Sequence, residues 1–148
     1  MSKKCKATLM VLFIVYCTVM FWLLFARSGS GIRGISLAPF ATIKEFWTVM
    51  RQSCGREGME ALFMISLINL AGNVVMFIPL GFFLPLLWQK IRRWWRSLAV
   101  CGALIVAVEA LQFAASRGSA DIDDFILNML GAALGHAAFA LIKRQLEE

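Results

Sequence analysis

The sequence predicts an all-α protein: a membrane-embedded bundle of about four transmembrane helices, with an interfacial segment between the first and the second. Of the 148 residues, 60% are hydrophobic and only 16% are charged, whereas a soluble domain averages ~45–50% apolar and ~25% charged residues. The apolar residues fall into four long runs separated by polar or basic segments. A chain of this length cannot bury so much apolar surface inside a water-soluble core. We therefore expect residues 1–148 to form a single transmembrane domain, as a multi-pass protein of the cell membrane.

The first apolar run covers residues 7–26 and contains no charged residue. Its length is enough to cross the ~30 Å hydrocarbon core of a bilayer. Lysines precede it and the small residues Ser28, Gly29 and Ser30 follow it, as they would in a signal peptide. The apolar core of a signal peptide is shorter, ~7–15 residues, so we expect a retained transmembrane helix.

The longest connection, residues 27–60, opens with a Gly/Ser-rich stretch and then carries an amphipathic segment over residues 41–50. This segment is too short to span a bilayer. Its aromatic residues, Phe46 and Trp47, suit the membrane–water interface. We expect it to lie on the bilayer or to pack against the bundle.

The remaining runs predict helices over residues 61–88, 97–115 and 122–142. Pro79 and Pro85 should kink or end the second helix near its far end, because proline lacks the backbone donor. The basic, aromatic segment 89–96 that follows is typical of a juxtamembrane anchor among anionic head groups.

The distribution of basic residues predicts that both termini are cytoplasmic. With that orientation, nine lysines and arginines lie inside, close to the helix ends where the positive-inside rule weighs most, and six lie outside. The inside set is Lys3, Lys4, Lys6, Lys90, Arg92, Arg93, Arg96, Lys143 and Arg144, and the outside set is Arg27, Arg33, Lys44, Arg51, Arg56 and Arg117.

The net charge of +6 does not indicate a nucleic-acid partner here, because the basic residues cluster beside the apolar runs. The expected contacts are membrane lipids. The four cysteines have no metal-binding spacing. We expect no cofactor, and no metal, since the segment 121–124 lacks an EF-hand pattern despite its three carboxylates. His136, the lone histidine, is expected to pack between helices. The oligomeric state stays open.

Polar residues inside the apolar runs are the candidate functional residues. An ionisable side chain in a membrane helix costs ~2.5–3.5 kcal/mol, so each one needs a partner or a purpose. Spacings of three and four place residues on one helix face, and three such sets occur. They are Asn69 with Asn73, Glu109 with Gln112, and Asp121 with Asp124 and Asn128.

These sets also lie at matched depth. At ~1.5 Å per residue, Asn69, Glu109 and Asn128 are each roughly 10 Å below the outer end of their helix. Arg117 and the three aspartates would sit above them at the rim. The pattern predicts a polar pocket within the membrane that opens outward.

The competing interpretation is that these residues only join the helices. Buried amides bond between membrane helices for ~0.6 kcal/mol on average, Glu109 could pair with Arg117, and Asp121 could cap the last helix. Gly131 and Gly135 continue nearly the same stripe, and such a small-xxx-small pair predicts close approach to another helix.

Three parts of the chain resemble the VanZ-like family. The stretch 69–81 resembles its N-x-x-x-F-x-P-x-G signature, and residues 37–40 resemble a short Pro-Phe motif that the family carries after its first helix. The other part resembles its E-x-x-Q…R…D-x-x-D-x-x-x-N-x-x-G-x-x-x-G signature, through Glu109, Gln112, Arg117, Asp121, Asp124, Asn128, Gly131 and Gly135. The resemblance covers about residues 35–140.

The resemblance implies a small, mostly bacterial type of membrane protein, in a family named after a member linked to resistance to teicoplanin, a lipid-tailed glycopeptide. It also implies that the polar residues form the family's polar core. The candidate ligand-binding residues are Asn69, Asn73, Glu109, Gln112, Arg117, Asp124 and Asn128.

Two functions follow as hypotheses. A binder would accommodate a lipid-linked cell-wall precursor or a lipoglycopeptide at the pocket. An enzyme would act on a lipid-linked substrate, with Glu109, Asp121 and Asp124 as candidate catalytic groups. A transporter fits less well, because four helices without a repeat make a poor alternating-access machine.

Overall fold

The computed structural model describes residues 3–26, 35–36, 39–53, 60–115 and 120–147, most of which are helical. Four of the described helices are long and apolar enough to cross a membrane, which confirms the all-α membrane fold. They are α1 (Lys3–Ala26), α3 (Glu60–Leu87), α4 (Trp94–Ala114) and α5 (Ile122–Glu147). The first helix starts four residues before the predicted residue 7, and the last continues five residues beyond 142, since lysine, arginine and glutamine are good helix formers.

The two prolines lie inside α3. The helix runs through Pro79 and ends at Leu87, two residues after Pro85, as the missing backbone donors predict. A short 3₁₀ turn, η1 (Gln89–Ile91), then reverses the chain into α4.

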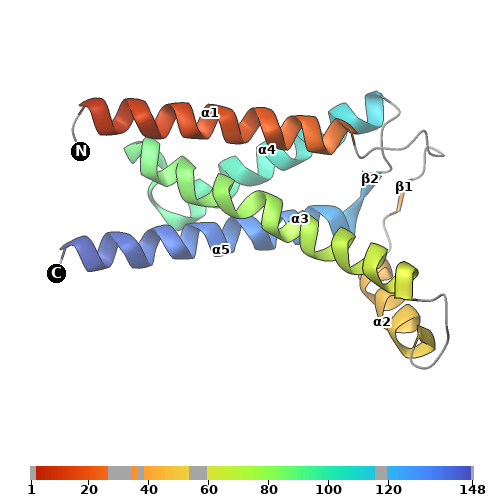
Figure 1. Ribbon diagram of the computed structural model, residues 1–148. Helices are drawn as coiled ribbons and strands as arrows, with labels where there is room; N and C mark the ends of the chain where they lie inside the picture. Colours follow the sequence, from red (N-terminus) through yellow and green to blue (C-terminus); the bar gives the residue numbers. More distant parts are fainter. Residues whose placement is uncertain (1–2, 27–34, 37–38, 54–59, 116–119, 148) are drawn as a thin grey trace.

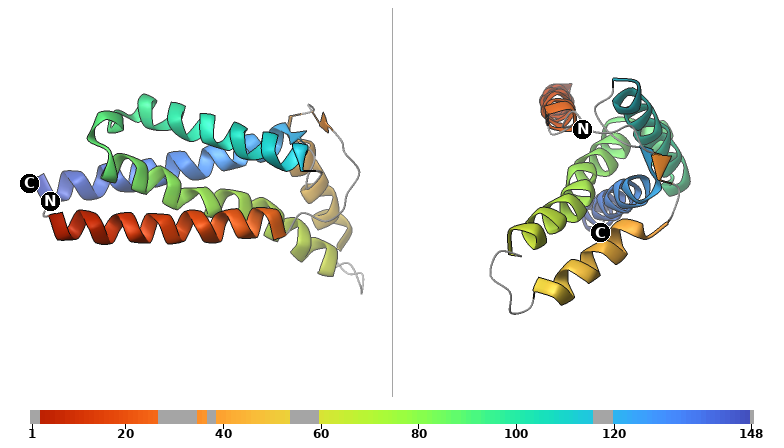
Figure 2. Two further views of the ribbon diagram at one scale, coloured as in Figure 1. Left: turned by 90° about the horizontal axis from the view of Figure 1, so that it is seen from above. Right: turned by 90° about the vertical axis from the view of Figure 1, so that its right-hand side faces the viewer.

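The four long helices form a bundle in which α3 and α5 make the most extensive contact. Figure 1 shows α3 crossing α5 obliquely, with α4 beside them and α1 along the edge. The ends of α1 and α5 that carry the chain termini lie at one end of the bundle, together with η1 (Figures 1 and 2). We call this the terminal end.

The opposite end, called here the strand end, carries the non-spanning elements. Strand β1 (Ile35–Ser36) pairs in parallel with β2 (Ala120–Asp121), directly before α5. Helix α2 (Ala41–Ser53) follows β1 and packs beside the start of α3, where the Phe46 ring lies 5.5 Å from that of Phe63. The predicted amphipathic segment is therefore a helix against the bundle, and its Trp47 stays half exposed.

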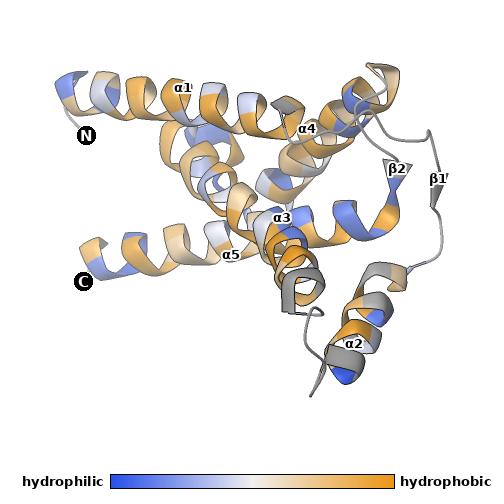
Figure 3. Ribbon diagram, turned by 45° about the vertical axis from the view of Figure 1, so that its right-hand side comes forward, coloured by the Kyte–Doolittle hydropathy of each residue, from blue (hydrophilic) through white to orange (hydrophobic). Residues whose placement is uncertain are grey.

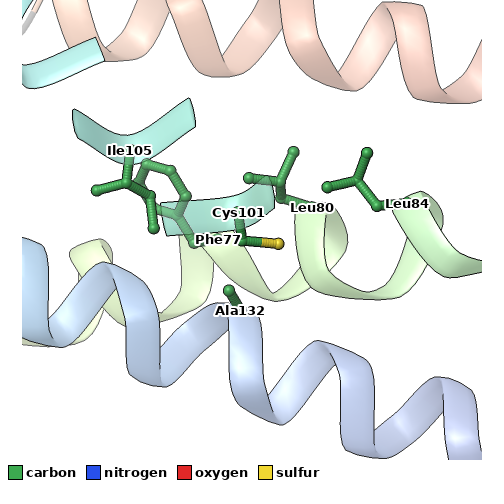
Figure 4. Packing of buried hydrophobic residues seen from close by; sticks show 6 residues of the cluster. All are labelled: Phe77, Leu80, Leu84, Cys101, Ile105 and Ala132. Atoms are coloured by element: carbon green, nitrogen blue, oxygen red, sulfur yellow. The ribbon is translucent and has the colours of Figure 1, made fainter. Parts of the chain in front are cut away.

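The centre of the bundle is a small apolar cluster shared by α3, α4 and α5 (Figure 4). Its buried members are Phe77, Leu80, Leu84, Cys101, Ile105 and Ala132. Large apolar side chains are exposed on all four long helices, whose ribbons are mostly coloured as hydrophobic in Figure 3, as expected for faces that contact lipid.

Three glycines let α3 and α5 approach at backbone distance. A Cβ atom at Gly131 would overlap the carbonyl oxygen of Val74, and one at Gly135 would overlap that of Ile78. Gly81 lies on α3, and a Cβ atom there would overlap the Ala132 backbone of α5 in the same way. The close approach predicted from the Gly131 and Gly135 pair is confirmed, and α3 is the partner helix. Because the two helices are fixed this tightly, the polar residues on them are also fixed relative to each other.

Candidate functional site

A hydrogen bond between Asn73 and Asp124 joins α3 to α5 near the strand end. The Asn73 amide donates to the Asp124 carboxylate with an N···O distance of 2.5 Å. A bond to a charged acceptor is shorter and stronger than one between neutral groups. This hydrogen bond places Asn73 at the same depth as Asp124. From the sequence, Asp124 is expected at the rim, above the depth of Asn73. The physical reason is that the helices are staggered, since α3 extends past the start of α5 at the strand end (Figure 1).

Glu109 of α4 completes the group from the third helix. Its carboxylate lies within electrostatic range of Asp124 and Asp121. Its Oε1 atom is buried and has no hydrogen-bond partner in the described part of the chain. The structure thus brings three predicted carboxylates together from α4, β2 and α5.

Asn128 lies one helical turn below Asp124 on α5. The residue is only 5% exposed, and its Oδ1 atom has no hydrogen-bond partner within the described segments. Side chains on a helix lean toward its N-terminus, onto the residue four positions earlier. Asn128 and Asp124 therefore lie on the same face of α5. Together with Asn73, Glu109, Asp121 and Asp124, it makes up what we call the polar cluster.

Asp123 fixes helix α2 beside this site, a role that the sequence analysis did not predict. It is 1% exposed and accepts the backbone N–H of Phe40 at 2.6 Å. Phe40 has a left-handed φ of 64°, a conformation that is unfavourable for a residue with a side chain. The Phe40 carbonyl accepts the N–H of Lys44 in the first turn of α2. Asp123 therefore fixes the start of α2 to the start of α5, and the Pro-Phe motif is the signal that could have indicated it.

Asp121 supports the same corner. Its carboxylate accepts the backbone N–H of Asp123 at 2.9 Å, in the manner of an N-terminal cap. This agrees with the capping alternative for Asp121, and it does not prevent the second carboxylate oxygen from facing the cluster.

Other candidate residues are placed elsewhere. The Gln112 side chain donates to the Leu24 carbonyl of α1 at 3.1 Å, so it ties α1 to α4. Asn69 is exposed, one turn closer to the strand end than Asn73. Arg117 lies outside the described residues, and so does the predicted pairing of Arg117 with Glu109.

Within the described residues, no group of three or more His, Cys, Asp or Glu side chains is arranged to hold a metal ion. His136 lies in the half of α5 toward the terminal end, away from the polar cluster, with its ring 5.9 Å from that of Phe139. It is buried between helices, as a packing residue would be.

The fold and the site define a class: a small multi-pass membrane protein in which three of the four spanning helices contribute to a polar cluster near one end of the bundle. The family model VanZ/LLP1 matches residues 13–143, nearly the whole chain, and the protein belongs to this family. Neither a curated protein nor a solved structure gives a match.

Proposed function

We propose that this protein binds a lipid-linked or lipid-tailed ligand at the polar cluster and lowers susceptibility to lipoglycopeptide antibiotics such as teicoplanin. The observation that carries the proposal is that two of the four buried side-chain atoms without a hydrogen-bond partner in the described segments, Glu109 Oε1 and Asn128 Oδ1, belong to this cluster. Leaving a buried polar group unsatisfied costs ~1–3 kcal/mol. Side chains that only joined the helices would satisfy each other, whereas a bound ligand would satisfy these atoms when it arrives.

The orientation supports a site on the outer side of the membrane. The basic residues of α1, η1, α4 and α5 gather at the terminal end, because these helices and η1 begin or end there (Figure 1). By the positive-inside rule this end faces the cytoplasm. The polar cluster then lies toward the outer leaflet, where lipid-linked cell-wall precursors and a lipid-tailed antibiotic are met.

Drug susceptibility of a sensitive Gram-positive host tests the proposal. Wild type, Glu109→Gln and the control Glu147→Gln would be expressed at equal membrane levels. The control makes the same chemical change at the terminal end of α5. We expect wild type and Glu147→Gln to raise the inhibitory concentration of teicoplanin, but not of vancomycin, and Glu109→Gln to lose the effect. An unchanged teicoplanin value in the wild-type strain would refute the antibiotic role.

The proximity of Glu109 to Asp121 and Asp124 favours a second candidate, an enzyme acting on a lipid-linked substrate. One carboxylic acid and one carboxylate within electrostatic range of each other could serve as general acid and general base. An enzyme would lose activity in Glu109→Gln, which removes the acid, while keeping its affinity for the substrate. A binder that needs the charge of Glu109 would lose affinity instead. Measuring ligand retention by the purified variant separates the two.

A further inference from the structure

We infer that the turn between α3 and α4 binds an anionic phospholipid, and that two arginines of this turn recognise the lipid phosphate by hydrogen bonds. The inference concerns the terminal end of the bundle and is independent of the proposed function. Residues 88–96 contain four basic residues and no acidic one. All four basic side chains are exposed. They are Lys90, Arg92, Arg93 and Arg96, which we call the basic corner.

The basic corner lies at the depth of the lipid head groups. The candidate spans before and after it are Phe63–Leu87 and Trp94–Ala114. Segment 88–93 therefore connects the ends of two spanning helices, at the terminal end (Figure 2). Trp94 and Trp95 are 67% and 49% exposed, and tryptophan favours the membrane interface. The molecules that surround this turn in a membrane are lipids, and their phosphates lie in the same layer.

The end of α3 holds the guanidinium of Arg92 in place. Helix α3 ends at Leu87, so the Pro85 carbonyl lies in the last turn, where carbonyls lack a partner within the helix. Arg92 Nε donates to this carbonyl at 3.3 Å. The guanidinium carbon also lies 6.0 Å from the centre of the Phe139 ring. An arginine has five N–H donors, and this hydrogen bond leaves four of them for a ligand.

Arg96 is held in a similar way from the start of α4. Its Nη1 donates to the Lys90 carbonyl at 3.2 Å. Its guanidinium carbon lies 4.9 Å from the centre of the Trp95 ring, within the range of a cation–π interaction. Each guanidinium therefore has one backbone carbonyl and one aromatic ring that set its orientation. A group that is oriented before its ligand binds loses less conformational freedom on binding.

The charge of the basic corner selects an anionic ligand. None of its four cations forms an ion pair with a carboxylate in the described part of the chain. The planar guanidinium matches the oxygens of a phosphate with two parallel hydrogen bonds. A lipid with a net negative charge supplies these oxygens and neutralises the cations. A zwitterionic lipid carries the same phosphate, but its own ammonium group competes for it.

Two lipids with identical acyl chains test the inference: anionic phosphatidylglycerol and zwitterionic phosphatidylcholine. Purified full-length protein in a neutral detergent would be incubated with an equal mixture, and the bound lipids would be counted by native mass spectrometry. Wild type would be compared with Arg92→Lys/Arg96→Lys and Arg92→Gln/Arg96→Gln. The matched control, Lys3→Gln/Lys4→Gln, removes two exposed cations from the start of α1 at the same end of the bundle.

We expect wild type and the control to retain phosphatidylglycerol about tenfold more strongly than phosphatidylcholine, a ratio equivalent to ~1.4 kcal/mol. The paired glutamine variant should bring the ratio to about one, because it removes both charges and both donor groups. The paired lysine variant should lower the ratio to about threefold or less, because lysine keeps the charge but has no planar fork of donors.

Equal retention of the two lipids by wild type would overturn the inference. A wild-type ratio in the paired lysine variant, or a loss in the control as large as in the paired glutamine variant, would also overturn it, since both results indicate attraction by charge alone. Displacement of the lipid by an equal concentration of inorganic phosphate would assign the basic corner to free phosphate instead.

Because Arg92 also caps the end of α3, a melting curve must show that each variant is folded. Arg96→Lys alone leaves the Arg92 contact with Pro85 intact. This single variant should also lower the lipid ratio, and an unchanged ratio in the folded protein would contradict the role of Arg96.

Discussion

At the scale of the residue, the Asn73 and Asp124 pair is the contact that turns two separate sequence patterns into one site. Each residue belongs to a different stretch of the chain, 51 positions apart, and their side chains meet at 2.5 Å. The bond matters for position as much as for energy, because Asp124 also lies within range of Glu109. The hydrogen bond from the Phe40 N–H to the Asp123 carboxylate likewise fixes α2 beside the site.

The Asn73 and Asp124 bond predicts a measurable coupling energy. In a double-mutant cycle of Asn73→Ala and Asp124→Ala, the two changes should be non-additive by ~0.6 kcal/mol, and by at most ~1.7 kcal/mol, the range found for hydrogen bonds between membrane helices. The free energy of unfolding in mixed micelles would be measured for the four proteins. Strict additivity would show that the bond contributes nothing to stability.

At the scale of the element, the packing of α3 on α5 is the feature on which the bundle depends. Gly81, Gly131 and Gly135 each place a bare Cα against the backbone of the other helix. Membrane helices gain little from the hydrophobic effect when they associate, so close van der Waals packing must supply the stability. A backbone, unlike the end of a flexible side chain, cannot move aside for a new methyl group.

Alanine at these glycines should therefore disrupt the bundle. We expect Gly131→Ala and Gly135→Ala to lower the free energy of unfolding by at least the ~1–3 kcal/mol typical of overpacking, or to prevent accumulation in the membrane. Gly102→Ala is the matched control, since its Cβ would meet the Met129 sulfur at an ordinary 3.4 Å, and alanine is the better helix former by ~1 kcal/mol. Equal loss of stability in all three variants would contradict this account.

At the scale of the whole molecule, charge and stagger together determine what the bundle presents on each side. A chain that crosses the membrane four times has both termini on one side. The basic residues of α1, η1, α4 and α5 lie at that end of the bundle. Glu109, Asp121 and Asp124 belong to the end of α4, to β2 and to the start of α5, which lie toward the other end (Figure 1). The cluster is therefore expected to be reached from the outer leaflet.

Reporter fusions test this topology. A fluorescent protein fused after Glu148 should be fluorescent and alkaline phosphatase fused there should be inactive, because both termini are expected in the cytoplasm. Phosphatase fused after Ala115, at the end of α4, should be active. Replacing Lys90, Arg92, Arg93 and Arg96 with Gln should weaken this asymmetry. Active phosphatase at Glu148 would reverse the orientation and place the cluster on the cytoplasmic side.

The sequence by itself determined the membrane class, the four spanning helices and the candidate residues, because these depend on local quantities. Run length against bilayer thickness, prolines inside a helix and the three–four spacing of polar residues are all visible along the chain. Glu109, Asp121, Asp124 and Asn128 were identified in this way, since a charge or amide inside an apolar run stands out against its neighbours.

Only the tertiary structure decided which residues meet. The position of a residue on a helix face indicates where its side chain points but not which residue it meets. Gln112 shares a face with Glu109, yet it forms a hydrogen bond with α1. The depth of each polar residue was counted from the end of its own helix, as if the helix ends were level. The helices are staggered instead, and the stagger of α3 brings Asn73 to Asp124. The role of Asp123 needed the left-handed turn at Phe40, 83 positions away. Such contacts depend on how helices cross and slide, and the glycine contacts between α3 and α5 fix that geometry.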